Sequence, residues 1–449
     1  MKTNKISTPI VDFVLKYADE ESLRLHMPGH KGKNVLGFEK LDITEIPGAD
    51  SLFEADGIIA ESEKNLTELF ETKASFYSAF GSSSCIKAML FLAMKCHLGE
   101  DKKKVIAAGN VHKSYVHAEA ILDFETVWIG KRENLYSCKI TPDTLEKAIS
   151  DNPGASAVYL TSPDYLGNMQ DILTLSKVCR KNGIPLLVDN AHGAYLKFTT
   201  PSMHPMDLGA DMCCDSAHKT LPVVTGGAYL HVSKSCKYDF APFVKSAMAL
   251  FSSTSPSYLI LASLDKANEL LQDGFSASVN RLCSKVSSLR KRLLDAGYNT
   301  VGDEPLKITL FSKKYGYHGQ EIAKTLTDNG IVPECFDRDC VVLMFSPFNS
   351  EGDVERVERI LLSVPKKEEI FEDIPSLPSR ATFMSSRQAM LSLSERVATR
   401  VALGRILASP SVSCPPAIPI ALCGDKISRE AIKCFEYYGI EYLDVVLDG

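Results

Sequence analysis

The sequence is short of the features that mark membrane, secreted and nucleic-acid-binding proteins. No run of about 18 residues is continuously apolar, and the stretch MKTNKISTPIVDFVLKYADEES lacks the apolar centre of a signal peptide. There is no long basic run and the net charge is −6, so we expect no binding to nucleic acid or membrane. The thirteen cysteines include no C-x-x-C pair, so we expect no metal; their odd number indicates reduced thiols and a cytoplasmic location.

What is present is an alternation of short apolar runs and helix-period segments. The 449 residues, 45% of them hydrophobic, suffice for two or three domains. The expected strands are SFYSAF, KKVIAAG, ETVWIG, SAVYLTSP, IPLLVDNAHG, ADMCCDS and GAYLHVS. The expected helices between them are SCIKAMLFLAMKCH, HKSYVHAEAIL, TPDTLEKAIS and DILTLSKVCRKNG. This order predicts an α/β fold with a mainly parallel sheet covered by helices on both faces.

The rest of the chain is organised differently. Two helical stretches follow residue 232, and from LKITLF onward strands and helices alternate at a smaller scale, which indicates a second, α+β domain. VPKKEEIFEDIPSLPSR mixes charge with proline and is typical of a connector, and the proline-rich SCPPAIPIALCGD indicates a further C-terminal subdomain.

Ligands of mainly parallel sheets bind at the carboxyl ends of the strands, and Gly81, Asp189 and Lys219 all fall there. In GSSS, free N–H groups at a helix start and three hydroxyls, of Ser82, Ser83 and Ser84, would form a phosphate cradle. An ordinary serine N-cap is the alternative, and it needs only one of these hydroxyls.

Each of the other polar residues also has one structural and one functional interpretation. Asp189 ends an apolar strand, where it is either a turn residue or the partner of a cationic ring nitrogen, with His192 beside it or over the ring. Lys219, in DSAHKT, is either a solvated lysine or a desolvated amine able to attack a carbonyl, with His218 as a proton relay. His112 is either a loop histidine or a ring that stacks on a cofactor.

Together, the phosphate cradle, the ring-facing carboxylate and the reactive amine fit pyridoxal 5′-phosphate (PLP), and Lys219 is interpreted as its Schiff-base lysine. The sequence also resembles the ornithine/lysine/arginine decarboxylases, which have the aspartate-aminotransferase fold (fold type I), from about residue 24 to at least residue 265. The segments that carry the resemblance are LHMPGHKG, DITEIPGADSL, GSSSCIKAM, GNVHKS, TSPDYLG, VDNAHGAY, DSAHKTLP and TSPSYLILASLD.

The resemblance implies roles for individual residues. Lys219 carries the cofactor, Asp189 pairs with its ring nitrogen and His112 stacks on the ring. The remaining cofactor contacts implied are Ser82, Ser83, Ser84, Ala191, His192 and Ser216. Ser253 would reach the phosphate of a neighbouring subunit, so the site would lie at a homodimer interface. The implied domains are an N-terminal segment (1–50), a large PLP-binding domain (51–300), a small α+β domain (301–370) and a C-terminal subdomain (371–449), without the N-terminal response-regulator-like domain of longer members.

Four positions depart from the family pattern. Asn190 stands in place of glutamate, Gly226 in place of glutamine, Ala417 in place of glycine and Asp425 in place of glutamate. The implied cofactor residues are kept and peripheral pocket residues are changed. This pattern indicates intact PLP chemistry on a substrate other than the usual one, and the altered pocket is the basis of the alternative reaction given below.

The sequence therefore predicts a PLP-dependent decarboxylase that converts arginine, lysine or ornithine into an amine for polyamine biosynthesis. Carbon dioxide leaves when its bond to Cα stands perpendicular to the cofactor ring. Aminotransferases hold that carboxylate near the ring plane, commonly with an arginine, and CVVLMFSPFN contains none. An aminotransferase or lyase acting on another amino acid is the alternative. A regulatory protein that has kept the scaffold is a third hypothesis, which the intact Lys219 opposes.

Overall fold

The computed structural model describes residues 6–20, 22–95, 103–134, 137–272, 274–372, 374–414 and 418–447. The chain divides into two compact units: the first is formed by Met1–Leu98 with Ile172–Asn280, the second by Gly99–Asp171 with Arg281–Gly449. The four-domain division expected from the sequence stays a prediction. In the part of the chain that is described, no helix combines the length and the apolar character needed to cross a membrane.

The main sheet has seven strands in the order β1-β9-β8-β7-β6-β2-β3. Its strands in chain order are β1 (Ala74–Ser78), β2 (Lys104–Ala108), β3 (Glu125–Ile129), β6 (Ala157–Thr161), β7 (Leu186–Asp189), β8 (Met212–Asp215) and β9 (Ala228–Val232). β9 runs antiparallel to β1 and β8, whereas β7 pairs with β8 in parallel, as β2 does with β3 and β6. All seven predicted strands and the mainly parallel sheet are confirmed.

The inner strands are continuous apolar runs because they are covered on both faces. Every residue of β6, β7, β8 and β9 is buried. Two carboxylates stand at the ends of these apolar runs, because Asp189 and Asp215 are the last residues of β7 and β8.

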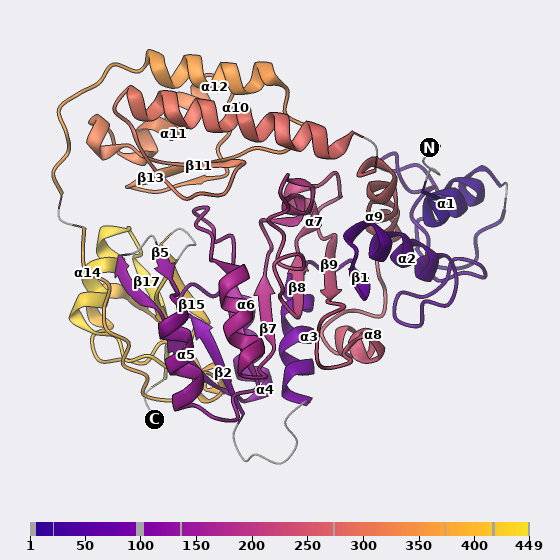
Figure 1. Ribbon diagram of the computed structural model, residues 1–449, viewed down its shortest axis with the longest axis horizontal. Coiled ribbons are helices and arrows are strands. Elements are labelled where there is room, and N and C mark those ends of the chain that lie inside the picture. Colours follow the sequence, from indigo (N-terminus) through magenta and orange to yellow (C-terminus); the bar gives the residue numbers. More distant parts are fainter. Residues whose placement is uncertain are drawn as a thin grey trace. The chain divides into compact units, whose positions relative to one another are not determined.

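The first unit adds helices around its four strands. They are α1 (Pro9–Asp19), α2 (Ile58–Phe70), α3 (Ser82–Lys95), α6 (Ile172–Lys181), η1 (Ala194–Phe198), α7 (Ala217–Thr220), η2 (Ala241–Phe243), α8 (Val244–Ala249) and α9 (Tyr258–Leu270). Helix α3 contacts β7, β8, β9 and α8, which explains why it is apolar on nearly all sides (Figure 1). The long α10 (Phe275–Asp295) begins in this unit and ends in the other.

The second unit contains a separate four-stranded sheet, in the order β10-β11-β13-β12. Its elements are β10 (Asn299–Val301), β11 (Lys307–Phe311), η3 (Lys313–Tyr315), α11 (Gly319–Asp328), β12 (Cys335–Phe336), β13 (Cys340–Met344) and α12 (Glu351–Ser363). All pairings are antiparallel, and α11 and α12 lie on one face of this sheet (Figure 1). The α+β character predicted for this segment is seen directly.

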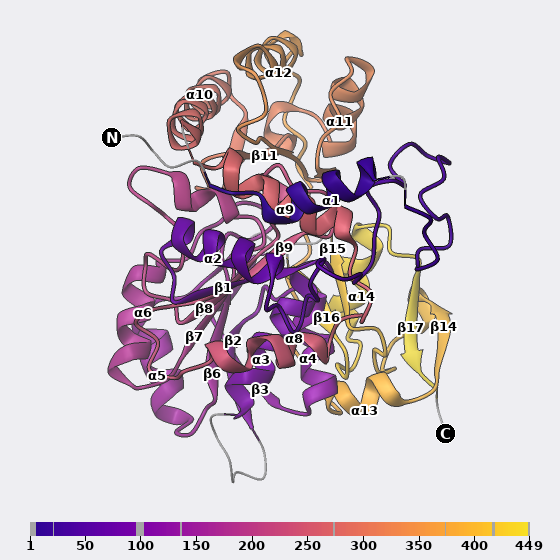
Figure 2. The same cartoon turned by 90° about the vertical axis from the view of Figure 1, so that its right-hand side faces the viewer.

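The other elements of the second unit are α4 (Lys113–Leu122), β4 (Lys131–Asn134), β5 (Ser137–Lys139), α5 (Pro142–Asp151), α13 (Ser386–Leu391), β14 (Ser394–Ala398), η4 (Thr399–Val401), β15 (Ser411–Cys414), β16 (Ile418–Leu422), α14 (Arg429–Tyr437) and β17 (Tyr442–Val446). In the C-terminal segment, β14 pairs with β17 and β15 with β16 (Figure 2). Leu407, Ile420, Phe435 and Val445 are among the buried residues of its own apolar core.

Candidate functional site

The predicted site residues of the first unit gather where β7 and β8 end. The two strands are in register, with Asp189 opposite Cys214, so the turns that follow them leave the same edge of the sheet. The first turn carries Ala191 and His192, and the second carries Ser216 and the short helix α7 with Lys219.

Lys219 is the centre of this arrangement. Its side chain is half-buried, and Nζ lies 2.9 Å from Nε2 of His192. His192 itself is only 5% exposed. Two residues that the sequence placed in the site separately are thus within hydrogen-bonding distance, and the amine is directed at an imidazole on the neighbouring turn.

The serine cluster stands at the start of α3. Gly81 has a φ of +73°, and the helix begins at the next residue. The Ser216 hydroxyl donates to the Ser82 hydroxyl at 2.7 Å, which connects the lysine turn to this helix N-terminus. Ser84 is 2% exposed, and its hydroxyl donates to the Gly81 carbonyl at 3.0 Å. Ser82 and Ser83, which are half-buried, therefore remain the more accessible hydroxyls of the three.

Gly226, one of the four departures, has a physical explanation. Its φ of +103° is one that L side chains rarely adopt, and a Cβ would lie 3.0 Å from Cδ1 of Ile260 and 3.4 Å from the carbonyl oxygen of Ala79. Its own carbonyl accepts the Gly81 N–H at 2.7 Å. A glutamine would be strained in this turn, so glycine here fits the backbone that supports the serine cluster.

Asp189 is buried, with 2% of its surface exposed. Its Oδ1 accepts the N–H of Ala191 at 3.2 Å, and the Cys214 thiol donates to the same oxygen at 3.8 Å. A carboxylate at such a position is costly unless it has partners, and these contacts satisfy it in part.

His218 precedes Lys219 and turns toward β9. Its Nδ1 lies 2.9 Å from the carbonyl oxygen of Gly227, so Nδ1 carries a proton and donates it to that oxygen. Burial lowers the pKa of His218 and outweighs the opposing effect of this hydrogen bond. The ring is therefore mainly neutral at pH 7, with a lone pair on Nε2.

Two further predicted residues make local contacts of their own. His112 is an exposed residue of the second unit, where it caps α4 by accepting the Ser114 N–H at 3.2 Å. Ser253 is exposed in the first unit, and its hydroxyl accepts the Ser255 N–H at 3.1 Å. The stacking of His112 and the role of Ser253 in a neighbouring subunit stay predictions.

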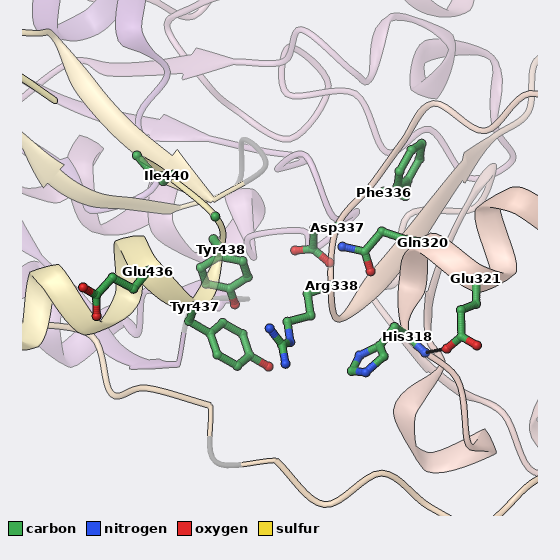
Figure 3. Close-up of a pocket in the computed structure, with 11 residues that line it drawn as sticks. His318, Gln320, Glu321, Phe336, Asp337, Arg338, Glu436, Tyr437, Tyr438 and Ile440 are labelled. Atoms are coloured by element: carbon green, nitrogen blue, oxygen red, sulfur yellow. Dashed lines mark hydrogen bonds between the residues drawn. The ribbon is translucent and has the colours of Figure 1, made fainter. Parts of the chain in front are cut away.

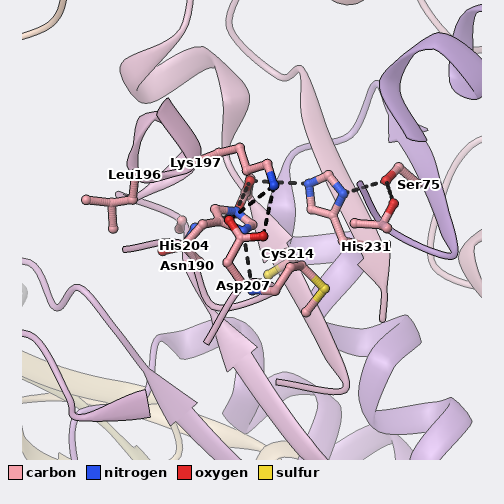
Figure 4. A network of polar contacts seen from close by, with 12 residues as sticks. Ser75, Asn190, Leu196, Lys197, His204, Asp207, Cys214 and His231 are labelled. Carbon is pink, nitrogen blue, oxygen red and sulfur yellow. Dashed lines mark hydrogen bonds and ion pairs between the residues drawn. The ribbon is translucent and has the colours of Figure 1, made fainter. Parts of the chain in front are cut away.

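A group of buried polar residues beneath this edge was not predicted from the sequence. His204, Asp215 and His231 have no exposed surface, and Asp215 contacts both histidines and Asn190. Figure 4 labels His204, His231 and Asn190. Asp215 directly precedes the DSAHK serine and His231 belongs to GAYLHV, so both were visible in the motifs. The signal that could have identified them is a charged or imidazole side chain inside an otherwise apolar strand.

The remaining departures belong to the second unit. The Asp425 carboxylate accepts two hydrogen bonds from Arg380, at 2.9 and 3.0 Å, and one from the Leu422 N–H at 3.0 Å. Asp425 is 3% exposed, so this acid is engaged in an internal ion pair. Ala417 lies outside the described residues.

The second unit also contains a pocket of about 790 Å³ (Figure 3). Its lining includes His318, Phe336, Arg338, Tyr437 and Tyr438, and none of the residues predicted for the site lines it. Figure 3 shows Tyr437 and Arg338 turned toward one another, and the Arg338 guanidinium carbon lies 5.0 Å from the centre of that ring.

Comparison with known proteins agrees with the motifs. The curated relatives include the uncharacterized protein YaaO of Bacillus subtilis (strain 168), which is 28% identical over 467 residues that cover 95% of this chain and 93% of YaaO. They also include an arginine decarboxylase of the same organism, 27% identical over 464 residues, with 95% of this chain and 92% of that protein covered.

Among solved structures, the lysine decarboxylase LdcF of Francisella novicida matches with a TM-score of 0.81 and 16% identity, covering 98% of this chain and 81% of that one. This likeness confirms the fold that the resemblance implied. The family model "Orn/Lys/Arg decarboxylase, major domain" matches residues 8–301, which is more than half of the chain. The chain therefore belongs to the ornithine/lysine/arginine decarboxylase family.

Proposed function

We propose that the protein is a PLP-dependent decarboxylase of arginine, lysine or ornithine, with Lys219 as the residue that binds the cofactor aldehyde. The observation that carries the proposal is the Lys219 amine, held 2.9 Å from His192 on the sheet edge that also carries Asp189 and the paired hydroxyls of Ser82 and Ser216. Family membership and the arginine decarboxylase relative support the reaction class.

The residues present fit PLP. The N-terminus of α3 offers backbone N–H groups and the helix dipole to a phosphate, and Ser82, Ser83 and Ser216 add hydroxyl donors. The buried carboxylate of Asp189 suits a protonated ring nitrogen, because such a pair compensates both charges. Ala191 and His192 line the turn between this carboxylate and the amine, and His112 is proposed to stack on the ring.

PLP, when bound, accepts the electron pair that is left on Cα as carbon dioxide departs. The chain supplies orientation and protons. His218 donates its Nδ1–H to Gly227, so Nε2 is the nitrogen able to hold and return a proton. Because burial holds the pKa of His218 below its usual range, that nitrogen is mainly unprotonated at neutral pH and is free to take up a proton during the reaction.

Decarboxylation is favoured over transamination by the small domain. β13 and the residues after it, Cys340 to Asn349, include no arginine to hold a carboxylate near the ring plane. The alternative reaction was suggested by the altered pocket residues, and two of these have a structural explanation. Gly226 fits the backbone geometry of its turn, and Asp425 forms an internal ion pair with Arg380.

We further propose a homodimer with Ser253 acting in the neighbouring site. The segment that contains HMPGHKG exposes apolar side chains that a soluble monomer would be expected to cover. Leu23, Leu25, Met27, Val35 and Leu36 are between 66% and 84% exposed. A partner subunit seated on this segment would bury them. The proposed reaction suits a cytoplasmic enzyme of polyamine biosynthesis.

The test is direct. The purified protein, supplied with PLP, is incubated with carboxyl-labelled arginine, lysine or ornithine, and both labelled carbon dioxide and the amine product are measured. We expect release from one of the three substrates well above the other two. A keto acid without an amine would favour an aminotransferase instead, and no product from any of the three would refute the substrate proposal.

A further inference from the structure

A buried carboxylate connects the two turns that carry the proposed site. Asp215, the last residue of β8, has no exposed surface. Its Oδ2 lies 3.0 Å from Nε2 of His204 and 3.3 Å from Nε2 of His231, and its Oδ1 accepts the side-chain N–H of Asn190 at 2.7 Å. Figure 4 shows His204, His231 and Asn190 converging from three different segments.

The hydrogen bonds at the far side of each ring identify where the protons are. The Met206 N–H points at Nδ1 of His204 at 3.3 Å, so this Nδ1 is an acceptor and Nε2 carries the proton. Nδ1 of His231 lies 2.7 Å from the Ser75 hydroxyl, which in turn lies 2.6 Å from the Thr72 hydroxyl, so a chain of hydroxyl donors can serve this ring in the same way.

With these protons in place, Asp215 accepts from both imidazoles and from Asn190. Burial alone would raise the pKa of Asp215, but His204 and His231 outweigh it and hold the pKa well below its usual range. The carboxylate is therefore ionised, and its neighbours satisfy it through three N–H donors.

A metal ion is the competing explanation for this group. The ligand atoms of His204, Asp215 and His231 lie within 4.8 Å of one another. However, a metal on Nε2 of His204 would need the proton of that nitrogen to move to Nδ1, which already faces the Met206 N–H. A hydrogen-bonded carboxylate satisfies all of these contacts without an ion.

We infer that Asp215 is a positioning residue for PLP, an inference that rests on the proposed function. Asn190 directly follows Asp189, and Asp215 directly precedes Ser216. The 2.7 Å hydrogen bond between Asn190 and Asp215 therefore links two turns. One turn is proposed to face the cofactor ring, and the other carries Lys219 and the hydroxyl proposed to bind the phosphate. His204 and His231 fix Asp215 from its other side.

The same contact explains the first departure from the family pattern. A glutamate at position 190 would bring a second carboxylate against Asp215 inside the protein, where like charges repel strongly. Asn190 instead supplies a donor. Asn190 and Asp215 thus form a matched pair, and changing one should require a change in the other.

The first test compares two buried aspartates of the first unit. Asp215→Asn is matched with Asp265→Asn, because Asp265 is also fully buried but holds the Ile10 and Val11 N–H groups of α1, at 2.9 and 3.0 Å. PLP affinity is measured by titrating each apoprotein and following the visible absorbance of the bound cofactor, beside circular dichroism and thermal unfolding.

Both variants should lose stability, since each removes a buried charged acceptor. Only Asp215→Asn should weaken PLP binding, by at least about tenfold, the scale of one hydrogen bond to a charged group. Equal PLP affinity in the two variants would refute the positioning role, whereas a wild-type protein that binds no PLP would instead refute the proposed function.

The second test is a double-mutant cycle on the matched pair. Asn190→Asp places two carboxylates in contact and should weaken PLP binding, and adding Asp215→Asn should recover part of that loss because one donor and one acceptor face each other again. Additive losses would show that the two residues act independently. Stoichiometric bound metal in the wild-type protein, absent from Asp215→Asn, would overturn the hydrogen-bond assignment.

Discussion

The two lysines at the centre of the two polar regions contact different kinds of side chain. In the first unit, Lys219 faces the imidazole of His192 at 2.9 Å. In the second unit, Lys313 lies 2.6 Å from carboxylate oxygens of both Asp339 and Glu372. Its Nζ is 4.9 Å from the ring centre of Tyr437, which lines the pocket of Figure 3. Hydrogen bonds to these carboxylates raise the pKa of Lys313 even though burial opposes them.

The difference shows why the size of a pocket is a poor guide to chemistry in this protein. An amine held by two carboxylates keeps its proton and has no lone pair with which to attack a carbonyl. The hydroxyls of Tyr437 and Tyr438 also donate to Asp339, at 2.7 and 2.8 Å, so the charges beside that pocket serve one another. The amine proposed to react is Lys219, whose Nζ lies 2.9 Å from an imidazole nitrogen of His192.

The largest effect is expected when each of the two lysines is replaced by alanine in turn. Lys219→Ala should abolish the visible absorbance of bound PLP and reduce carbon dioxide release at least about 10³-fold, as expected when a covalent catalytic group is removed. Lys313→Ala is the matched control: it should keep the absorbance while lowering the unfolding midpoint. If the absorbance survived in Lys219→Ala and disappeared in Lys313→Ala, the PLP site would belong to the second unit and the proposed role of Lys219 would be wrong.

The next largest effect is expected at the carboxylate beside the lysine turn. Asp189→Asn keeps the shape of the side chain but removes the charge that is proposed to keep the cofactor ring nitrogen protonated. We expect kcat to fall roughly 10²-fold, the scale of losing one preorganised electrostatic contact, with a smaller change in KM. The measurement is steady-state kinetics at saturating PLP, and a kcat within threefold of wild type would contradict the role.

The polar region around Lys219 was largely predictable from the sequence. Inner strands of a parallel sheet are apolar throughout, so Asp189 stands out at the end of IPLLVD, and the serine and lysine motifs follow strands in the same way. The seven strands were identified by their apolar runs and the helices between them by their period, because both signals are local.

The contacts within and below the site were not predictable in the same way. His204 reaches Asp215 from a loop whose path is set by packing, and Arg380 meets Asp425 across 45 residues of chain. No period or turn motif records such pairings. Likewise, Asp425 was expected among the altered pocket residues, and only its two hydrogen bonds to Arg380 show that its carboxylate is already engaged.

That ion pair gives the third prediction, an effect on stability in the second unit. Arg380→Ala would leave the buried Asp425 without its cation and remove the guanidinium that lies 4.5 Å from the Trp128 ring centre. We expect a loss of about 3 kcal/mol in the free energy of unfolding, since breaking a buried pair strands a charge. Urea unfolding gives this value, and the exposed Arg400→Ala should change it by less than about 0.5 kcal/mol. PLP affinity should be unchanged, and a tenfold loss would mean that the two regions are coupled.

The smallest expected effect is a pH dependence beside the pocket. Hydrogen bonds from Arg338 and Lys313 lower the pKa of Glu372 from 4.5 to about 2. A carboxyl group whose pKa is lower in the folded than in the unfolded protein adds stability above its unfolded pKa and loses it as the pH falls toward the folded value. Glu372→Gln should therefore cost about 1 kcal/mol at pH 7, the scale of a solvent-screened ion-pair network, and progressively less between pH 4.5 and pH 2. Urea unfolding of both proteins across this range measures the difference, while carbon dioxide release at pH 7 should stay within twofold of wild type. A difference that grew as the pH fell would reverse the sign of this argument and show that Glu372 is stabilised in its protonated form.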